Sequence, residues 1–215
     1  MARNKHPEVT VNRILDASLK LFLEKGYEQT TIQDIINELG DLSKGAIYHH
    51  FKSKEDIIDA VSERLFESTN NEILRIKSEK GSTGLEKIRR IYYLSIQNPN
   101  QEKLITAAPT LLKNPKFLAE QVITSIEDVA PLLKDLIEEG IEDGSIKADR
   151  PKELSEMLIL LSNIWLNPMI FSNTSEELKQ KFLFLKKLTD NLGLPIFDED
   201  MLNMIDKYRE LVSIS

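Results

Sequence analysis

The groups most able to do chemistry are concentrated in one short stretch that follows Gly40. Three lysines, a tyrosine and two histidines lie there within a dozen residues: Lys44, Tyr48, His49, His50, Lys52 and Lys54. Lysine and tyrosine side chains donate hydrogen bonds to phosphate oxygens and to the edges of bases. The cluster therefore indicates a surface for a polyanion, although the net charge of the whole chain is −7.

The charge balance places any such surface in the first quarter of the chain. Residues 1–54 hold 8 lysines and arginines against 7 acidic residues, whereas residues 55–215 hold 20 against 28. The N-terminal quarter is thus the only part suited to a polyanion. Because DNA binding needs positive charge gathered on one face, the question becomes which element presents the cluster.

Metal binding and catalysis find little support in the same residues. Adjacent residues point about 100° apart on a helix, so His49 and His50 lack the i, i+4 spacing of a metal site. The chain has no cysteine and its third histidine is His6, so the remainder has neither a thiol nucleophile nor a histidine base. We expect no catalytic residue, no metal, no cofactor and no enzymatic activity. An enzyme that uses carboxylates stays open, although no acidic pair stands out.

The elements that must position the cluster are predicted to be helices. N-cap residues, glycine stops and helical periodicity predict four of them, over residues 9–25, between Thr31 and Gly40, from Ser43 to Phe51, and from Lys54 to about Lys80. Further apolar-periodic segments follow, and the alternation typical of strands is missing. The sequence therefore predicts an all-α protein of about nine or ten helices, with a three-helix helix-turn-helix domain over 1–53 and a helical domain over 54–215.

The predicted helix from Ser43 to Phe51 has two distinct sides. At about 100° per residue, Ile47 and Phe51 share one apolar side. Gly45, Tyr48 and His49 lie roughly opposite, with Lys44 at their margin. Two short helices joined by a tight turn, the second with such a face, are typical of a helix-turn-helix whose second helix enters the major groove.

The stretch "GYEQTTIQDIINELGDLSKGAIYHHFKSKEDIIDAV", Gly26 to Val61, resembles the DNA-binding region of the TetR family of bacterial transcriptional regulators. Its opening "GYEQTTIQDI", its "SKGAIYHHF" helix and its "KSKEDI" entry to the next helix match the family pattern in order, and the likeness covers about residues 9–65. The turn "GDLSKG" has one residue more than the common "GVSKG".

The resemblance implies a homodimeric repressor, less often an activator, that binds a palindromic operator in double-stranded DNA and is released by a small ligand. The family's DNA contacts correspond to Thr31 and Lys54 for phosphates, to Lys44, Gly45, Ala46 and Tyr48 near base edges, and to His49 and His50 for the backbone. His50 also lies beside the apolar side, so a packed histidine is an equal alternative.

The second domain is implied to bind the effector and to form the dimer. Two strongly apolar helical segments predict the dimer interface at Leu158, Leu161, Phe182 and Leu185, the alternative being that both segments fill a monomer core. Aromatic and thioether side chains predict the walls of a ligand pocket at Tyr92, Tyr93, Phe117, Met157, Trp165, Met169 and Phe171, the alternative being plain core. Glu120, Glu127 and Asp128 would favour a cationic ligand if any of them faced inward; the favoured alternative is that all three are exposed charges on the surface of a helix.

The sequence has no feature typical of a secreted or membrane-spanning protein. The N-terminus lacks an apolar signal core, and the apolar run over 157–171 is shorter than the roughly 20 residues that span a bilayer. We expect a cytoplasmic protein with no membrane partner. The alternative is a TetR-like helical interaction protein that acts through a protein partner without operator binding; such a protein has no reason to retain Lys44, Tyr48 and Lys54.

Overall fold

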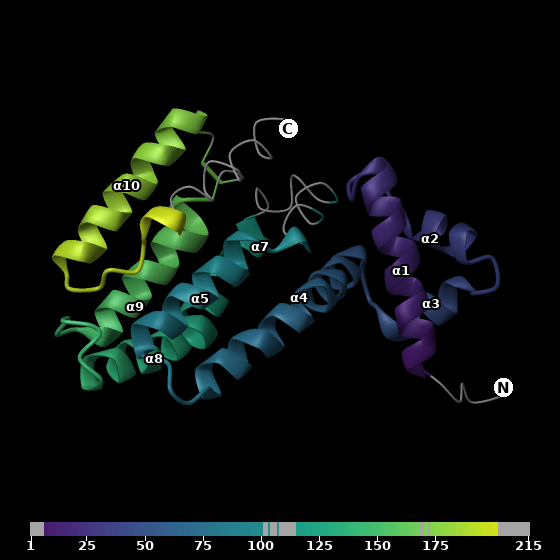
Figure 1. Ribbon diagram of the computed structural model, residues 1–215. Helices are drawn as coiled ribbons and strands as arrows, with labels where there is room; N and C mark the ends of the chain where they lie inside the picture. Colours follow the sequence, from purple (N-terminus) through teal and green to yellow (C-terminus); the bar gives the residue numbers. More distant parts are fainter. Residues whose placement is uncertain are drawn as a thin grey trace. The chain divides into compact units, whose positions relative to one another are not determined.

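The computed structural model describes residues 7–100, 103, 107, 115–167, 170–171 and 173–201 (Figure 1). The first helices are α1 (Pro7–Lys25), α2 (Ile32–Leu39), α3 (Lys44–His50), α4 (Lys54–Ser78) and α5 (Gly84–Ile96). They are followed by α7 (Pro115–Thr124), the π-helical turn η2 (Ser125–Val129), α8 (Ala130–Glu142), α9 (Pro151–Leu160), the π-helical turn η3 (Leu161–Trp165) and α10 (Ser175–Asn191). Strands are absent from these described ranges, and the predicted all-α fold is confirmed.

The chain folds into two compact units. The first comprises Met1–Ser68 and Pro99–Thr110, and the second comprises Thr69–Asn98 and Leu111–Ser215. Helix α4 therefore contributes its first part to one unit and its last part to the other. The functional boundary predicted between residues 53 and 54 stays a prediction, since packing alone does not define function.

The core of the first unit is built from apolar residues that recur at helical spacing on α1 to α4. Its fully buried side chains are Ile14, Phe22, Ile35, Ile47, Ile57, Ile58 and Val61. Burying a side chain of this size contributes roughly 1.5–3 kcal/mol, so the cluster holds the short helices α2 and α3, which are too short to be stable alone.

The second unit packs α5, α8, α9 and α10 with the segment that follows α10. Its core includes Ile88, Leu133, Leu136, Ile137, Leu154, Leu158, Leu185, Leu194, Ile196 and Phe197. The start of α5 crosses α8 at very short range, because a Cβ added to Gly84 would lie 2.3 Å from the backbone nitrogen of Gly140. Only glycine permits this approach of two backbones.

The predicted dimer interface needs a correction at two positions. Leu158 and Leu185 are both fully buried in the chain's own core, so neither side chain can contact a partner. Leu161 and Phe182 are partly buried and pack against the same core, and their place in an interface stays a prediction. The apolar circumference of the segment around α9 is thus explained largely by α5, α8 and α10 of the same chain.

Membrane insertion has no support from the helices in the described part of the chain. None of them combines the length and the apolar character that crossing a bilayer requires.

Candidate nucleic-acid interface

Helices α2 and α3 begin and end where their local sequence requires it. The Thr31 hydroxyl accepts a hydrogen bond from the backbone N–H of Asp34, while the Asp34 carboxylate accepts one from the N–H of Thr31, which completes a capping box. Gly40 ends α2 with φ of 74°, a conformation that favours glycine. Ser43 then caps α3 by accepting from the N–H of Ala46 at 3.2 Å.

Helix α3 turns one side to the core and one side to solvent, as its sequence predicts. Ile47 is fully buried and Phe51, at the end of the helix, is 8% exposed. On the other side, Tyr48 is 45% exposed. We call Lys44, Gly45, Tyr48 and His49, which are all exposed, the outer face of α3. Ala46 and His50 are half-buried at its edges.

The outer face of α3 combines a cation, an aromatic ring and an unobstructed backbone. The Lys44 ammonium lies 5.8 Å from the centroid of the Tyr48 ring. A Cβ added to Gly45 would meet only the Ser43 hydroxyl oxygen, at 3.9 Å. The fold therefore does not require glycine at this position, and the missing side chain leaves room for another molecule to approach the helix.

Ion pairs fasten α2 and the following turn to α1. The Arg13 guanidinium donates to both carboxylate oxygens of Asp41, at 3.1 and 2.6 Å. Lys20 pairs with Glu38 at 2.6 Å, and Lys25 pairs with Asp34 at 2.8 Å. Hydrogen bonds from Arg13 lower the pKa of Asp41, and those from Lys25 and Thr31 lower the pKa of Asp34.

These ion pairs were missed by the sequence analysis. Asp41 lies in the turn that is one residue longer than the family's common form, and its partner is 28 residues away. The sequence shows only that Arg13 and Asp41 carry opposite charges, and it does not show which of the many acidic residues pairs with Arg13. In the structure, the two hydrogen bonds from the Arg13 guanidinium to Asp41 hold the longer turn against α1.

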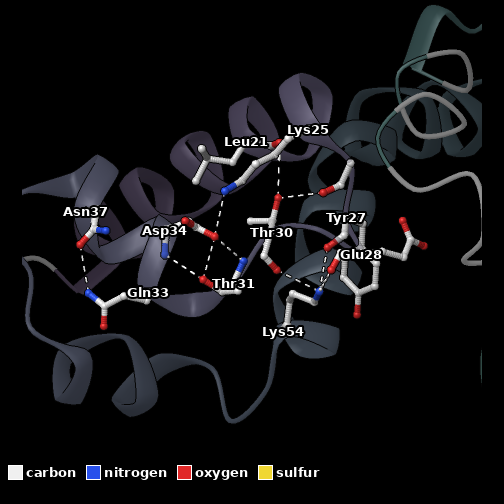
Figure 2. A network of polar contacts seen from close by, with 11 residues as sticks. Leu21, Lys25, Tyr27, Glu28, Thr30, Thr31, Gln33, Asp34, Asn37 and Lys54 are labelled. Atoms are coloured by element: carbon white, nitrogen blue, oxygen red, sulfur yellow. Dashed lines mark hydrogen bonds and ion pairs between the residues drawn. The ribbon is translucent and has the colours of Figure 1, made fainter.

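The predicted phosphate ligands Thr31 and Lys54 are engaged within the first unit (Figure 2). The Thr31 hydroxyl also donates to Asp34 at 2.7 Å. The Lys54 ammonium donates to the backbone oxygens of Tyr27 and Thr30 at 2.7 and 2.9 Å. Neither group belongs to the outer face of α3, and their roles toward DNA stay predictions.

The histidine pair shows no sign of a metal site. The rings of His49 and His50 meet edge to face, with centroids 5.1 Å apart. Among the residues that the structure describes, no group of three or more histidine, aspartate or glutamate side chains is arranged to hold a metal ion.

The predicted pocket residues of the second unit fall into different environments. The Tyr92 hydroxyl lies 2.9 Å from that of Ser162, and burial raises its pKa. The Tyr93 hydroxyl donates to Asp198 at 2.6 Å, and burial together with this carboxylate raises its pKa to about 12. Met157 packs against the core. The position of Met169 and the side chain of Phe117 lie outside the described residues.

The other apolar candidates lie beside α10. The Lys181 ammonium is 5.0 Å from the centroid of Trp165 and 4.5 Å from that of Phe171, which is 42% exposed. Phe184 meets Trp165 edge to face, with centroids 6.0 Å apart. Trp165 is partly buried against the core, whereas Phe171 is exposed, and their roles as walls of a ligand pocket stay predictions.

An uncharged polar cluster does form inside the second unit. The Asn163 amide donates to the Ser125 hydroxyl at 3.3 Å, and the preceding residue, Ser162, pairs with Tyr92. Ser125 is 1% exposed and begins η2, while Ser162 and Asn163 belong to η3. Single π-helical turns often occur at functional sites. The sequence analysis did not identify these residues as a site, because single serines and asparagines in a helix carry no distinctive spacing.

The acidic candidates do not support a cationic ligand. Glu127 and Asp128 are both exposed to solvent, as expected of charges on the outer side of a helix. The side chain of Glu120 lies outside the described residues.

The chain is similar to known proteins along both units. A family model described as bacterial regulatory proteins of the tetR family matches residues 14–61. A second model, described as a tetracyclin repressor-like C-terminal domain, matches residues 95–188. Together these models cover the helix-turn-helix and much of the second unit.

Individual relatives and a solved structure agree with the family models. IcaR, the negative transcriptional regulator of the biofilm operon icaADBC in Staphylococcus aureus, is 25% identical over 188 residues, which cover 82% of this chain and 99% of the relative. The transcriptional repressor KstR2 of Mycolicibacterium smegmatis is 28% identical over 148 residues, 66% of this chain and 70% of the relative. A TetR-family regulator from Pectobacterium atrosepticum has the same fold, with a TM-score of 0.62 and 19% identity over 90% of this chain and 98% of that one.

Proposed function

The chain belongs to the TetR family of bacterial transcriptional regulators, and we propose that it is a ligand-responsive repressor that binds its operator through the outer face of α3. The observation that best supports this proposal is the exposure of Tyr48: this large aromatic side chain is 45% exposed and lies beside Lys44. The opposite side of the same helix is fixed in the core. Exposed aromatic, cationic and glycine positions on the second helix of a helix-turn-helix suit the major groove.

The residue roles follow from where each group points. Lys44 and Tyr48 donate hydrogen bonds to base edges, Gly45 and Ala46 let the helix approach closely, and His49 contacts the backbone. Thr31 caps α2, so its backbone and hydroxyl orient the start of that helix toward a phosphate. His50, which is half-buried, serves as a packed residue at the edge of the face.

Dimerisation is proposed through the exposed apolar side of α10. Leu183 and Phe184 are 39% and 58% exposed, although the neighbouring Leu185 is fully buried. A twofold dimer presents two copies of α3, which read half-sites about one helical turn apart, so the operator is an inverted repeat. The partner is a second copy of this chain, as is usual for regulators of this family.

The effector site is proposed beside the polar cluster of Tyr92, Ser125, Ser162 and Asn163. Since these side chains are uncharged, the cluster favours a ligand with hydroxyl, carbonyl or amide groups over a cation. Because coupling between two sites is reciprocal, an effector that weakens operator binding must bind more weakly by the same factor when operator DNA is present. Equal effector affinity with and without the operator would contradict this mechanism.

The alternative of a protein-binding module without an operator is not favoured. The curated relatives are named as transcriptional repressors or negative regulators, and the residues of the outer face suit DNA. Regulation of transcription also implies a protein that works in the cytoplasm, where bacterial DNA lies.

The deciding experiment is selection of bound sequences from random duplex DNA by the purified protein. We expect enrichment of one inverted repeat, which would provide the operator for every later measurement. Recovery of unenriched DNA after several rounds, with protein shown by circular dichroism to be folded, would reject the proposed function.

A further inference from the structure

We propose that Lys54 is a positioning residue: its ammonium locks the loop between α1 and α2 onto the first turn of α4 and so fixes the helix-turn-helix, instead of binding a DNA phosphate. This inference rests on the proposed function and changes the role that the family resemblance gives to Lys54.

The ammonium is fully occupied by the protein. It donates to the backbone oxygens of Tyr27 at 2.7 Å, Thr30 at 2.9 Å and Glu28 at 3.3 Å (Figure 2). A lysine ammonium has three donors and no acceptor. The nitrogen also lies 4.2 Å from the centroid of the Tyr27 ring, within cation–π range. Binding a phosphate directly would require at least one carbonyl to lose its donor.

Electrostatics favours this arrangement over a free lysine at the same position. Lys54 is the first residue of α4, where the positive end of the helix dipole disfavours a cation. The carbonyl oxygens of Tyr27 and Glu28 belong to residues two and three positions after Lys25, the last residue of α1, and so follow the negative end of that helix. The Lys54 ammonium is therefore held away from the positive end of α4 and close to the carbonyl oxygens that follow the negative end of α1.

The loop that Lys54 holds leads straight into α2. Thr30 is 1% exposed, and its hydroxyl donates to the oxygen of Gly26 at 2.8 Å. The next residue, Thr31, is the N-cap of α2. The Tyr27 N–H donates to the oxygen of Ala107 at 2.8 Å, which fixes the other end of the loop.

A second contact from α4 supports the same loop. The Tyr27 hydroxyl donates to the Glu55 carboxylate at 3.2 Å, so two successive residues of α4 hold one aromatic side chain. Any displacement of the first turn of α4 is thereby passed to the start of α2, and through the turn to α3. Lys54 provides three hydrogen bonds that join α4 to this loop.

The substitution Lys54→Arg separates the two roles. Arginine keeps the charge and binds phosphates at least as well as lysine, but its planar fork does not fit three carbonyls that converge on one nitrogen. We expect operator affinity to fall at least tenfold, with an unchanged slope of log K against log salt. Lys20→Arg is the matched control, because the single carboxylate partner of Lys20 accepts either cation, and it should bind as the wild type does.

Every other result for Lys54→Arg overturns the inference. Wild-type operator affinity in Lys54→Arg would show that only the positive charge at this position matters, as expected of a phosphate ligand. If the wild type selects no operator, the proposed function fails instead, which is a separate outcome.

A measurement on the wild-type protein decides the matter even if Lys54→Arg does not fold. With ¹⁵N-labelled lysine, the ammonium signal of Lys54 should be protected from solvent exchange in the free protein and should not move when operator DNA is added. A signal that exchanges freely, or that shifts on binding DNA while backbone signals of α4 do not, would overturn the inference.

Discussion

At the scale of single residues, the outer face of α3 is made of side chains that the fold itself does not need. Tyr48 is largely exposed, and the space around Gly45 is open. Ile47, between them, is fully buried and holds the helix in place. The residue types on the outer face can therefore be determined by binding to another molecule and not by folding. The division of α3 into two sides follows from the helical spacing of its sequence.

Gly45→Ala should separate folding from DNA binding. An added methyl group meets only the Ser43 oxygen at 3.9 Å, and alanine is the better helix former by up to about 1 kcal/mol, so stability to urea should be kept or raised. Operator affinity should fall, because the methyl group occupies the space where the backbone approaches a base pair. Unchanged operator affinity would show that α3 does not approach DNA closely at this point.

At the scale of elements, helix starts are decided by a few neighbouring residues. Three described helices, α2, α5 and α10, begin with a complete capping box, in which Thr31, Thr83 and Thr174 are the N-caps. Such boxes satisfy backbone N–H groups that the helix leaves without partners. The three sites are chemically alike, but only α2 belongs to the helix-turn-helix.

Thr31→Ala should destabilise the protein and weaken operator binding together. Loss of an N-cap typically costs about 1 kcal/mol, which urea unfolding can measure. Thr83→Ala and Thr174→Ala are matched controls that remove the same kind of cap in the second unit. They should reduce stability by a similar amount and leave operator affinity unchanged. A loss of affinity common to all three variants would attribute the effect to stability rather than to α2.

Gly84→Ala should be far more damaging than Gly45→Ala. The new Cβ would lie 2.3 Å from the nitrogen of Gly140 and 2.4 Å from the oxygen of Leu136, and backbone atoms cannot move aside as a flexible side chain can. Overpacking of this kind costs typically about 1–3 kcal/mol. Thermal unfolding should show a clear decrease for Gly84→Ala, and an unchanged midpoint would mean that α5 and α8 cross less closely than the structure indicates.

Helix starts and faces could be predicted from the sequence because their causes are local. The caps Thr31 and Ser43 lie beside the helices they begin, and helical spacing separates Ile47 from Tyr48. Contacts between distant residues could not be predicted, since nothing in the sequence pairs Lys54 with carbonyls 24 to 27 residues away. For the same reason the sequence predicts Leu185 at an interface, whereas the structure buries this side chain in the core.

At the scale of the whole molecule, the proposed regulation depends on a dimer with two copies of α3. The surface of α10 offers the apolar groups for such an association, because Leu183 and Phe184 remain exposed beside the buried Leu185. We propose that these exposed apolar side chains contact the same helix of a second copy.

Phe184→Glu should weaken dimerisation and leave each chain folded, because this side chain is 58% exposed in the single chain. Leu185→Glu, one residue away, should instead unfold the second unit, since it would bury an unpaired carboxylate. Leu74→Glu is the control, as Leu74 is 57% exposed on α4. Sedimentation at micromolar concentration distinguishes these cases. A dimer that is unaffected by Phe184→Glu would exclude this side of α10 as the interface.

The most direct test of the central claim compares Tyr48→Ala with the wild type on the selected operator and on random duplex DNA at one salt concentration. If the outer face of α3 reads bases, the variant should lose operator affinity by the roughly 1–3 kcal/mol that a base-edge contact carries, while its affinity for random DNA stays the same. Tyr48→Phe separates the hydroxyl from the ring. Equal operator affinity in the folded Tyr48→Ala variant and the wild type would contradict the assignment of sequence recognition to this face.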